Sequence, residues 1–369
     1  MMIKENYNVI GVMSGTSLDG VDLAHIQFSI IDGIWQFKIL EAQTVAYSDD
    51  WVEKLKNALN LDATSLSHLN NAYTITLASI IKQFITTNKL HTIDAVCSHG
   101  HTILHQPHKG ITLQIGNQKE IALLIDQTVV CDFRVDDVAL GGQGAPLVPI
   151  GDQKLFNQYD YCMNLGGFSN ISYTEDGNQI AYDICAVNTV LNFYANQLNL
   201  PYDDQGKIAR QAKVDTKLLQ ELSELDYYKI PHPKSLGYEF VQEIAIPLID
   251  SYSISIEDKI ATFTHHIAQQ IAAVLPNRKA AILITGGGAY NSFLIEKLQE
   301  KLPLLHIVIP DRKTIEFKEA LIFGFLGILK LREEINVLKS VTGARRDHSS
   351  GRIYPRPTSP LEKDFITAK

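Results

Sequence analysis

The stretch NVIGVMSGTSLDGVDLAHIQFSI, residues 8–30, decides the fold of this chain. Its two ends, residues 8–13 and 21–30, are rich in β-branched and apolar side chains and therefore predict two strands. The seven residues between them contain two glycines and several polar side chains, which are typical of a turn. A third strand is expected at residues 35–47. The chain thus opens with an antiparallel β-meander whose first turn is unusually rich in glycine and hydroxyl groups.

The same order of elements begins again at residue 161. Residues 161–165, 170–174 and 179–184 predict three more strands, and Gly166 and Gly167 lie in the first turn. In both halves, helices follow the meander, and short strands then alternate with helices. We therefore predict an α/β protein in which two domains share one design, with a ligand cleft between them.

Length and composition agree with two globular domains. The chain has 369 residues, of which 45% are hydrophobic and 20% charged, as in ordinary folded proteins. We expect an N-terminal domain at residues 1–157, to which the tail 335–369 is a candidate addition. A C-terminal domain is expected at residues 158–334.

Charge and hydropathy exclude two classes of partner. The 33 Lys and Arg residues are scattered and fewer than the 41 Asp and Glu residues, so the net charge is −8. A nucleic-acid partner is not expected, because phosphate contacts need clustered basic side chains. No apolar run approaches the roughly 20 residues of a membrane helix, and no secretory signal is visible. We therefore expect no membrane partner and a cytoplasmic location.

Neither the cysteines nor the histidine-rich segment gives a strong metal motif. The four cysteines lie far apart, which favours buried free thiols over a zinc site or a disulfide framework. The segment SHGHTILHQPH, residues 98–108, contains four histidines without an accompanying cysteine or carboxylate. Histidines that form hydrogen bonds in a loop or with a ligand are therefore favoured over metal ligands.

The first turn is a candidate phosphate-binding loop. Its glycines allow backbone N–H groups to converge on an anion, and its hydroxyl groups add donors. Asp19 and Asp22 are suited to hold Mg²⁺ through water. The turn is not a Walker A loop, because it lacks the lysine and no helix follows directly. A hairpin built from ordinary turn residues is the alternative.

Three further features point to chemistry. Gly166 and Gly167 occupy the matching turn of the second half, so two glycine turns are candidates to grip a triphosphate. Residues 286–288 are three glycines between a strand and a helix, where a phosphate or a flexible loop is expected. Asp183 follows a predicted strand and is a candidate general base, with a helix N-cap as the alternative.

Together these motifs resemble the signature of the anhydro-N-acetylmuramic acid kinase family. The resemblance covers nearly the whole chain. Its ordered matches are GVMSGTSLDGVD (11–22), SHGHT (98–102), TLQIG (112–116), DFR (132–134), GGQGAPLVP (141–149), NLGGFSNI (164–171), HPKS (232–235), TGGGAYN (285–291), EAL (319–321) and SVTGA (340–344). It implies the fold of the sugar kinase, Hsp70 and actin superfamily, in which two ribonuclease-H-like (actin-like ATPase) domains close over ATP.

The resemblance also implies a reaction and a set of site residues. Family members hydrolyse the 1,6-anhydro ring of anhydro-N-acetylmuramic acid and phosphorylate O6, giving N-acetylmuramic acid 6-phosphate and ADP. By this match Asp183 is the base, Arg134 lies near the sugar, and Glu319 helps to place water or sugar. The predicted ATP-binding residues are Gly15, Thr16, Ser17, Leu18, Asp19, Gly20, Val21, Asp22, Gly166, Gly167, Gly286, Gly287, Gly288 and Asn291, with Asp19 and Asp22 as Mg²⁺ ligands. A homodimer is expected by analogy.

Departures from the family pattern leave the substrate open. After the base, the family commonly reads TGPGN, whereas this chain reads ICAVN at residues 184–188. A kinase for another anhydrosugar, such as levoglucosan, therefore remains an alternative, as does a catalytically inactive sugar or nucleotide sensor. His101 replaces the usual glutamine, and Glu316 replaces the usual aspartate. The tail beyond Ala344 is longer than typical and has no assigned role.

Overall fold

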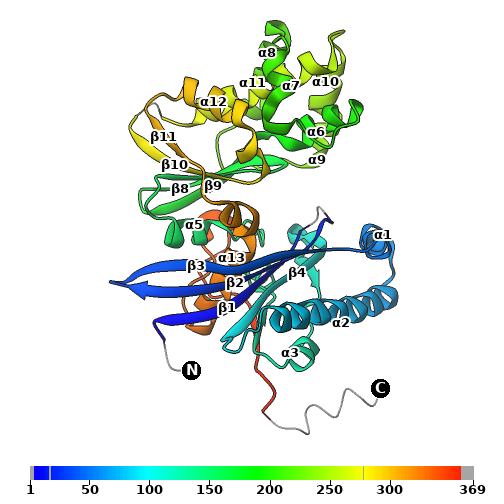
Figure 1. Ribbon diagram of the computed structural model, residues 1–369, viewed down its shortest axis with the longest axis vertical. Helices are drawn as coiled ribbons and strands as arrows, with labels where there is room; N and C mark the ends of the chain where they lie inside the picture. The colour runs from blue at the N-terminus through cyan, green and yellow to red at the C-terminus, as the bar shows by residue number, and fades with distance from the viewer. Residues whose placement is uncertain (1–3, 16–17, 277, 359–369) are drawn as a thin grey trace. The chain divides into compact units, whose positions relative to one another are not determined.

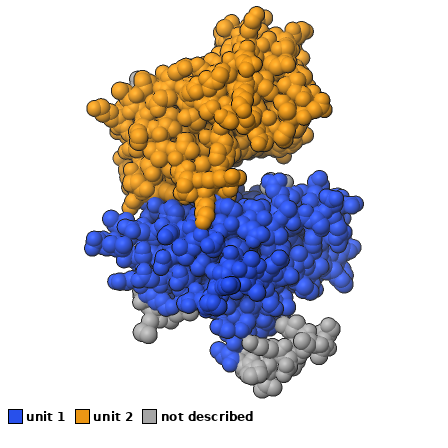
Figure 2. All heavy atoms as spheres, viewed as in Figure 1, with its two compact units in different colours: residues 1–155, 317–369 blue, residues 156–316 orange. Residues whose placement is uncertain are grey.

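The computed structural model describes residues 4–15, 18–276 and 278–358. The chain divides into two compact units, of which unit 1 comprises residues 1–155 and 317–369 and unit 2 comprises residues 156–316 (Figure 2). The first change of unit falls two residues from the expected boundary after residue 157. Residues 317–334 differ from the expectation, because they cluster with unit 1 instead of completing the C-terminal domain.

Unit 1 contains a seven-stranded mixed sheet (Figure 1). Its strands are β1 (Asn6–Ser14), β2 (Gly20–Ile31), β3 (Ile34–Ala46), β4 (Ala95–Gln106), β5 (Ile111–Ile115), β6 (Val129–Cys131) and β12 (Arg352–Tyr354). The order is β12-β6-β4-β1-β2-β3, and β5 pairs with β4. β1, β2 and β3 pair antiparallel, whereas β4 runs parallel to both β1 and β6. The expected opening meander is therefore confirmed.

The helices of unit 1 bury one apolar face each. They are α1 (Asp49–Asn57), α2 (Ala63–Thr87), α3 (Glu120–Ile125), α4 (Val135–Ala139), α5 (Pro149–Leu155) and α14 (Lys339–Thr342). In α2, Leu69, Tyr73 and Leu77 are buried in the core at the spacing of one helical face. The carboxylate of Asp62 caps this helix by accepting a hydrogen bond from Ser65 N–H at 2.8 Å.

Unit 2 repeats the strand order of unit 1. Its five strands are β7 (Tyr161–Leu165), β8 (Phe168–Glu175), β9 (Asn178–Ala186), β10 (Ala280–Thr285) and β11 (Leu305–Val308), in the order β11-β10-β7-β8-β9. β7, β8 and β9 form an antiparallel meander, and β10 runs parallel to both β7 and β11. The meander and the two parallel strands therefore correspond to β1, β2, β3, β4 and β6. The predicted α/β class with one repeated design is confirmed.

The helices of unit 2 surround a separate core. They are α6 (Asn188–Gln197), α7 (Lys207–Gln211), α8 (Thr216–Ser223), α9 (Tyr238–Phe240), α10 (Ile246–Asp250), α11 (Ile256–Val274) and α12 (Ser292–Lys301), and a π-helical segment, Val241–Ala245, joins α9 to α10. Phe263, Ile267 and Ile271 on α11 are buried in the core with the residues of β9 and β10. In the described ranges of both units, no helix has the length and apolarity needed to cross a membrane.

Helix α13 (Arg312–Leu331) explains why residues 317–331 belong to unit 1. The chain passes from unit 2 to unit 1 within this helix, whose backbone is kinked at Phe317. Beyond the kink, the helix lies directly on β1, because a Cβ atom added to Gly11 would come 1.9 Å from the carbonyl oxygen of Ala320. The backbones meet again where Gly324 approaches Gly11 Cα, at 3.7 Å from the position of an added Cβ. Glycine at position 11 therefore permits the close approach of helix and sheet.

A buried ion pair joins α13 to α5. Lys318 Nζ lies 2.8 Å from Asp152 Oδ1, and the two side chains are only 7% and 6% exposed. Replacing Lys318 by methionine leaves a buried carboxylate without its cation, so we expect the free energy of unfolding of unit 1 to fall by about 3–5 kcal/mol. The two tryptophans, Trp35 and Trp51, both belong to unit 1. Their fluorescence during urea unfolding therefore measures the stability of this unit selectively.

Lys54→Met is the matched control for this measurement. Lys54 pairs with Asp50 at 2.6 Å on the exposed face of α1, where both side chains are at least half exposed. Loss of such a pair costs at most about 0.5 kcal/mol. Equal losses in the two variants would show that the buried pair does not tie α13 to α5.

Candidate active site

Arg134 is held from two sides in unit 1. Its Nε–H donates to His99 Nε2 at 2.9 Å, and its Nη1–H donates to the carbonyl oxygen of Gly144 at 2.6 Å. Burial lowers the pKa of Arg134 to about 10, while Glu319 and Asp137 act in the opposite direction. The guanidinium is therefore protonated at neutral pH. Within the described ranges no hydrogen bond is assigned to Nη2, so this nitrogen can donate to a ligand.

His99 is an uncharged acceptor for that arginine. Its Nδ1–H donates to the carbonyl oxygen of Gly100 at 2.9 Å, which leaves the lone pair of Nε2 for Arg134. Burial, followed by the charge of Arg134, holds the pKa of His99 well below its usual range. The expectation of hydrogen-bonding histidines is thus confirmed for His99. Across the described part of the chain, no group of three or more His, Cys, Asp or Glu side chains is arranged to hold a metal.

Glu319 lies on α13, two residues beyond the kink. Solvent reaches its side chain, yet the surrounding protein disfavours the carboxylate and raises its pKa. The charge of Arg134 opposes this shift in the pKa of Glu319, and the charge of Asp22 adds to it. Three residues that the sequence predicts for the site, Arg134, Glu319 and Asp22, are therefore close enough in unit 1 to interact electrostatically.

The glycine-rich first turn is shaped by two unusual backbone positions. Leu18 has a positive φ of 63°, and its N–H donates to the carbonyl oxygen of Gly15 at 3.4 Å. A Cβ atom on Gly20 would come 2.3 Å from the carbonyl oxygen of Val45, so only glycine fits there. Val21 is buried in β2. The predicted ligands Thr16 and Ser17 lie outside the described residues.

The two predicted Mg²⁺ ligands have different surroundings. Asp22 Oδ1 accepts a hydrogen bond from Thr44 Oγ1 at 2.6 Å, which orients this carboxylate on β2. Asp19 is exposed on the turn. Protein Mg²⁺ sites commonly use one or two carboxylates together with water and substrate phosphates. The donor set of Asp19 and Asp22 fits that pattern.

A chain of buried hydroxyl groups anchors the start of this turn. Ser14 Oγ lies 2.8 Å from His101 Nδ1 and 2.6 Å from the Tyr47 hydroxyl, which in turn lies 2.5 Å from the Tyr73 hydroxyl. Burial lowers the pKa of His101 to about 4, so its ring is neutral at pH 7. Sequence reasoning missed Tyr47 and Tyr73, because their contacts join β3 and α2 to β1 across distant positions.

Asp183 is the central polar residue of β9 in unit 2. The strand continues to Ala186 rather than ending near Asp183, and a shift in pairing with β8 makes Ile184 a bulge residue. Asp183 Oδ2 accepts a hydrogen bond from Leu236 N–H at 2.9 Å. The backbone N–H of Asp183 donates to the carbonyl oxygen of Lys234 at 3.1 Å. Residues 234–236, which follow His232 and Pro233 in the HPKS motif, therefore border the carboxylate.

The electrostatic state of Asp183 favours proton uptake. Burial raises its pKa, and the Leu236 hydrogen bond only partly opposes that rise in pKa. The alternative role as a helix N-cap is wrong, because α6 begins after Val187 without a side-chain cap. Within the described ranges, no hydrogen bond is assigned to Asp183 Oδ1. This oxygen is therefore available to a substrate or a water molecule.

The segment that departs from the family pattern is part of the core of unit 2. Residues 184–187 complete β9 and its first turn, and each side chain is at most 2% exposed. All four cysteines of the chain, which include Cys185, are buried free thiols, as expected. The loss of glycines after Asp183 is thus accompanied by apolar packing against α6 and β8.

The other predicted nucleotide-binding residues have structural roles. Gly166 N–H donates to the carbonyl oxygen of Phe168 at 3.1 Å, and the carbonyl of Gly167 accepts from the N–H groups of Val187 and Thr189. Cβ atoms on Gly286 and Gly288 would come within 3 Å of Asn164 or Leu165, whereas Gly287 has room for one. Asn291 caps α12 by accepting a hydrogen bond from Leu294 N–H at 3.0 Å. These residues pack the turns after β7 and β10 together.

Comparison with known proteins places this geometry in a family. Residues 7–356 match the family model described as anhydro-N-acetylmuramic acid kinase. The proteins of that name from Hydrogenovibrio crunogenus and Pasteurella multocida are each 34% identical to this chain, of which each match covers 94%. The matches cover 97% and 96% of those relatives. Among solved structures, component A of the Acidaminococcus fermentans (R)-2-hydroxyglutaryl-CoA dehydratase has a TM-score of 0.45 at 13% identity, over 88% of this chain and 99% of that chain, which is too distant to carry an argument.

The sequence matches extend over both units and include the motifs around the best-defined polar residues. The matched range contains Asp183 with its raised pKa, the two-sided support of Arg134, and the glycine turn between β1 and β2. Full-length relatives share about a third of their residues with this chain. The chain belongs to the anhydro-N-acetylmuramic acid kinase family.

Proposed function

We propose that this protein is an ATP-dependent kinase that hydrolyses the 1,6-anhydro ring of anhydro-N-acetylmuramic acid and phosphorylates O6. The products are N-acetylmuramic acid 6-phosphate and ADP, which places the enzyme in peptidoglycan recycling. The observation that carries the proposal is the Asp183 carboxylate, held at Oδ2 by Leu236 N–H and with a raised pKa, in a chain of this family.

Asp183 acts in this proposal as the general base. It takes a proton from a water molecule whose oxygen forms a bond to the anomeric carbon. The bond between that carbon and O6 breaks, and O6 keeps the electron pair. O6 then attacks the terminal phosphorus of ATP, and ADP leaves. A carboxylate with a raised pKa is a stronger base than an ordinary aspartate, and a second-residue hydrogen bond orients it.

Residues of unit 1 hold the charged parts of the substrates in this scheme. Arg134 offers Nη2 to an anion, for which the lactyl carboxylate of the sugar is the proposed partner. Glu319 orients the attacking water or the sugar. The backbone from Gly15 to Asp22, with the side chains of Asp19 and Asp22, holds the nucleotide phosphates. ATP supplies the phosphoryl group, and Mg²⁺ on its phosphates neutralises charge during transfer. Because one reaction needs Asp183 and Arg134, both units must contribute to it.

Isotope labelling tests the proposal. The protein is incubated with anhydro-N-acetylmuramic acid, ATP and Mg²⁺ in ¹⁸O water, and the product is analysed by mass spectrometry. The label is expected at the anomeric oxygen and not in the phosphate group. Levoglucosan is supplied in parallel, because turnover of levoglucosan alone would refute the proposed substrate. Binding of either sugar without any turnover would support the sensor alternative.

The pH profile gives a second test of Asp183. Protonation removes the base, so kcat/KM falls as the pH falls through the pKa of Asp183 in the free enzyme. Because burial raises this pKa, we expect the loss to begin above the pH at which an ordinary aspartate with a pKa of about 3.9 titrates. Glu319 also has a raised pKa. The acid limb should therefore persist in Glu319→Gln, and its disappearance there would reassign it to Glu319.

Further properties are part of the same proposal. The enzyme is a cytoplasmic homodimer with a small-molecule substrate and with neither a nucleic-acid nor a membrane partner. The net charge of −8 supports the absence of a nucleic-acid partner. Light scattering of the purified full chain tests the dimer, for which a mass near twice 41.2 kDa is expected.

A further inference from the structure

The C-terminal strap, which we define as residues 337–350, packs against the glycine loop at residues 141–144 in unit 1. Gln143 N–H donates to the carbonyl oxygen of Thr342 at 2.8 Å, and Arg345 N–H donates to that of Leu140 at 3.2 Å. These contacts join positions about 200 residues apart in the sequence. They show that the strap is built into unit 1, although the sequence gave it no role.

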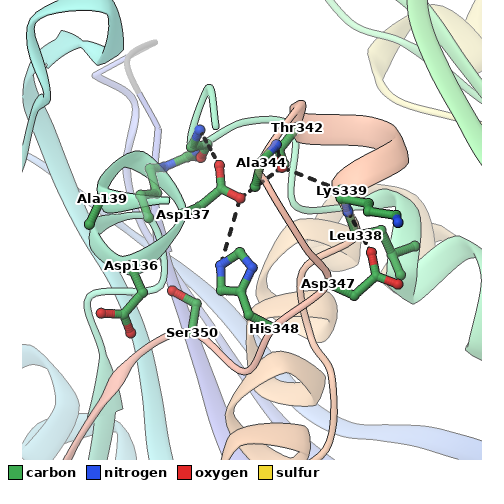
Figure 3. A network of polar contacts seen from close by, with 12 residues as sticks. Asp136, Asp137, Ala139, Leu338, Lys339, Thr342, Ala344, Asp347, His348 and Ser350 are labelled. Atoms are coloured by element: carbon green, nitrogen blue, oxygen red, sulfur yellow. Dashed lines mark hydrogen bonds and ion pairs between the residues drawn. The ribbon is translucent and has the colours of Figure 1, made fainter. Parts of the chain in front are cut away.

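Asp137 lies at the centre of this junction (Figure 3). Its carboxylate is completely buried and accepts hydrogen bonds from Gly144 N–H at Oδ2, at 2.7 Å, and from Thr342 Oγ1 at Oδ1, at 2.7 Å. His348 Nε2 lies 3.7 Å from Oδ1 on the strap side. A Cβ atom on Gly142 would come 2.2 Å from Oδ2, so the loop closes tightly around the carboxylate.

The same glycine connects this junction to the arginine of the proposed site. Gly144 gives its N–H to Asp137 and receives the Nη1–H of Arg134 on its carbonyl oxygen. His99 fixes the Nε edge of the guanidinium from the other side. The position of Arg134 is therefore determined by His99 directly and by Asp137 through Gly144.

We propose that Asp137, bound by Thr342 of the C-terminal strap, is a positioning residue that holds the Gly144 carbonyl against Arg134 and so orients this arginine toward a substrate carboxylate. The inference rests on the proposed function, because the carboxylate is that of the muramyl substrate. The buried carboxylate is needed for its fixed geometry: it joins a loop N–H and a strap hydroxyl on opposite oxygens. Neither Asp137 nor Thr342 touches the substrate.

The first experiment measures the arginine without any substrate. In protein labelled with ¹⁵N-arginine, the Nε–H signal of Arg134 is assigned by its loss in Arg134→Lys. Asp137→Asn and Thr342→Val are expected to shift this signal and to speed its exchange with solvent, whereas Thr342→Ser keeps the hydroxyl and the wild-type signal. Asp136→Asn is the matched control, since Asp136 contacts Gly351 N–H and Arg352 instead of the glycine loop. An unchanged signal in folded Asp137→Asn and Thr342→Val would overturn the proposal.

The second experiment measures recognition of the carboxylate. Asp137→Asn is expected to raise KM for anhydro-N-acetylmuramic acid about tenfold, the effect of weakening one hydrogen bond to a charged group, with little change in KM for ATP. With the methyl ester of the sugar, which lacks the charge, the variant and wild type should have equal KM values. Thr342→Val should show a smaller rise in the same direction, and it provides the test if Asp137→Asn does not fold. Equal penalties with acid and ester would overturn the positioning role.

The two experiments separate this inference from the proposed function. A wild-type enzyme that does not turn over the sugar would refute the proposed function, and the Arg134 signal would then decide whether Asp137 positions the arginine. An active wild-type enzyme in which Asp137→Asn changes neither the signal nor KM would refute the inference alone.

Discussion

Asp183→Asn is expected to lower kcat by about 10³-fold or more, within the range that a general base contributes. The amide has nearly the same shape as the carboxylate, and its oxygen can still accept the hydrogen bond from Leu236 N–H. It cannot take a proton from water, so the step that opens the anhydro ring is lost. ATP affinity should be unchanged within about twofold, because the change leaves the nucleotide contacts of the proposal intact.

The measurement combines steady-state kinetics with nucleotide titration by calorimetry. Asp176→Asn is the matched control, because Asp176 lies in the exposed turn of the same β8–β9 hairpin. Its positive φ of 49° is tolerated well by asparagine. Full activity of Asp183→Asn would refute the assignment of the base. A parallel loss of ATP affinity would point instead to a disrupted strand end.

Gly11→Ala is expected to destabilise unit 1 by at least about 3 kcal/mol, the upper part of the range for overpacked cores. The added Cβ would lie 1.9 Å from the Ala320 carbonyl oxygen and 2.7 Å from its carbonyl carbon. Both atoms belong to a helix backbone, so no side-chain rotation relieves the clash. Helix α13 must move away from β1, and Glu319, next to Ala320, moves with it. We therefore expect a loss of both stability and activity.

Tryptophan fluorescence during urea unfolding measures this effect in unit 1. Gly287→Ala is the control for stability, because an added Cβ there meets only Asn188 Nδ2, at an ordinary contact distance of 3.6 Å. Scanning calorimetry records the control, which lies in unit 2 and outside the range of the tryptophans. A Gly11→Ala protein with wild-type stability would show that α13 does not lie on β1 as closely as described.

Local patterns predicted the strands well, because alternating apolar side chains and glycine turns are encoded by neighbouring residues. The meander from Asn8 and its repetition from Tyr161 were therefore recognisable, and the repeated strand order confirms the shared design. The membership of residues 317–334 was not predictable in this way. It depends on the contact between Gly11 and Ala320, which lie about 300 positions apart and leave no local signal.

The site residues divide along the same line. Asp183 could be singled out as a carboxylate near a strand end, but its hydrogen bond to Leu236 spans 53 positions and its bulge depends on pairing with β8. Asp137 carried no recognisable motif, since its partner Thr342 lies 205 positions away. Asn291 is the opposite case: an asparagine directly before a helix is a local capping signal that sequence reasoning passed over. The catalytic roles of Asp183, Glu319 and Arg134 remain predictions.

The division of unit 1 into residues 1–155 and 317–369 has a consequence for the order in which the protein is made. During translation, the strands of unit 1 leave the ribosome long before the helix that covers them. Unit 2, which is one continuous segment, is complete at residue 316, before α13 can cover β1. The nascent chain must therefore carry the apolar surface around Val9 and Ile26, which Gly324 approaches in the finished protein, exposed throughout synthesis of unit 2. A chaperone that binds apolar segments has its longest opportunity there, and truncation before residue 317 leaves that surface permanently uncovered.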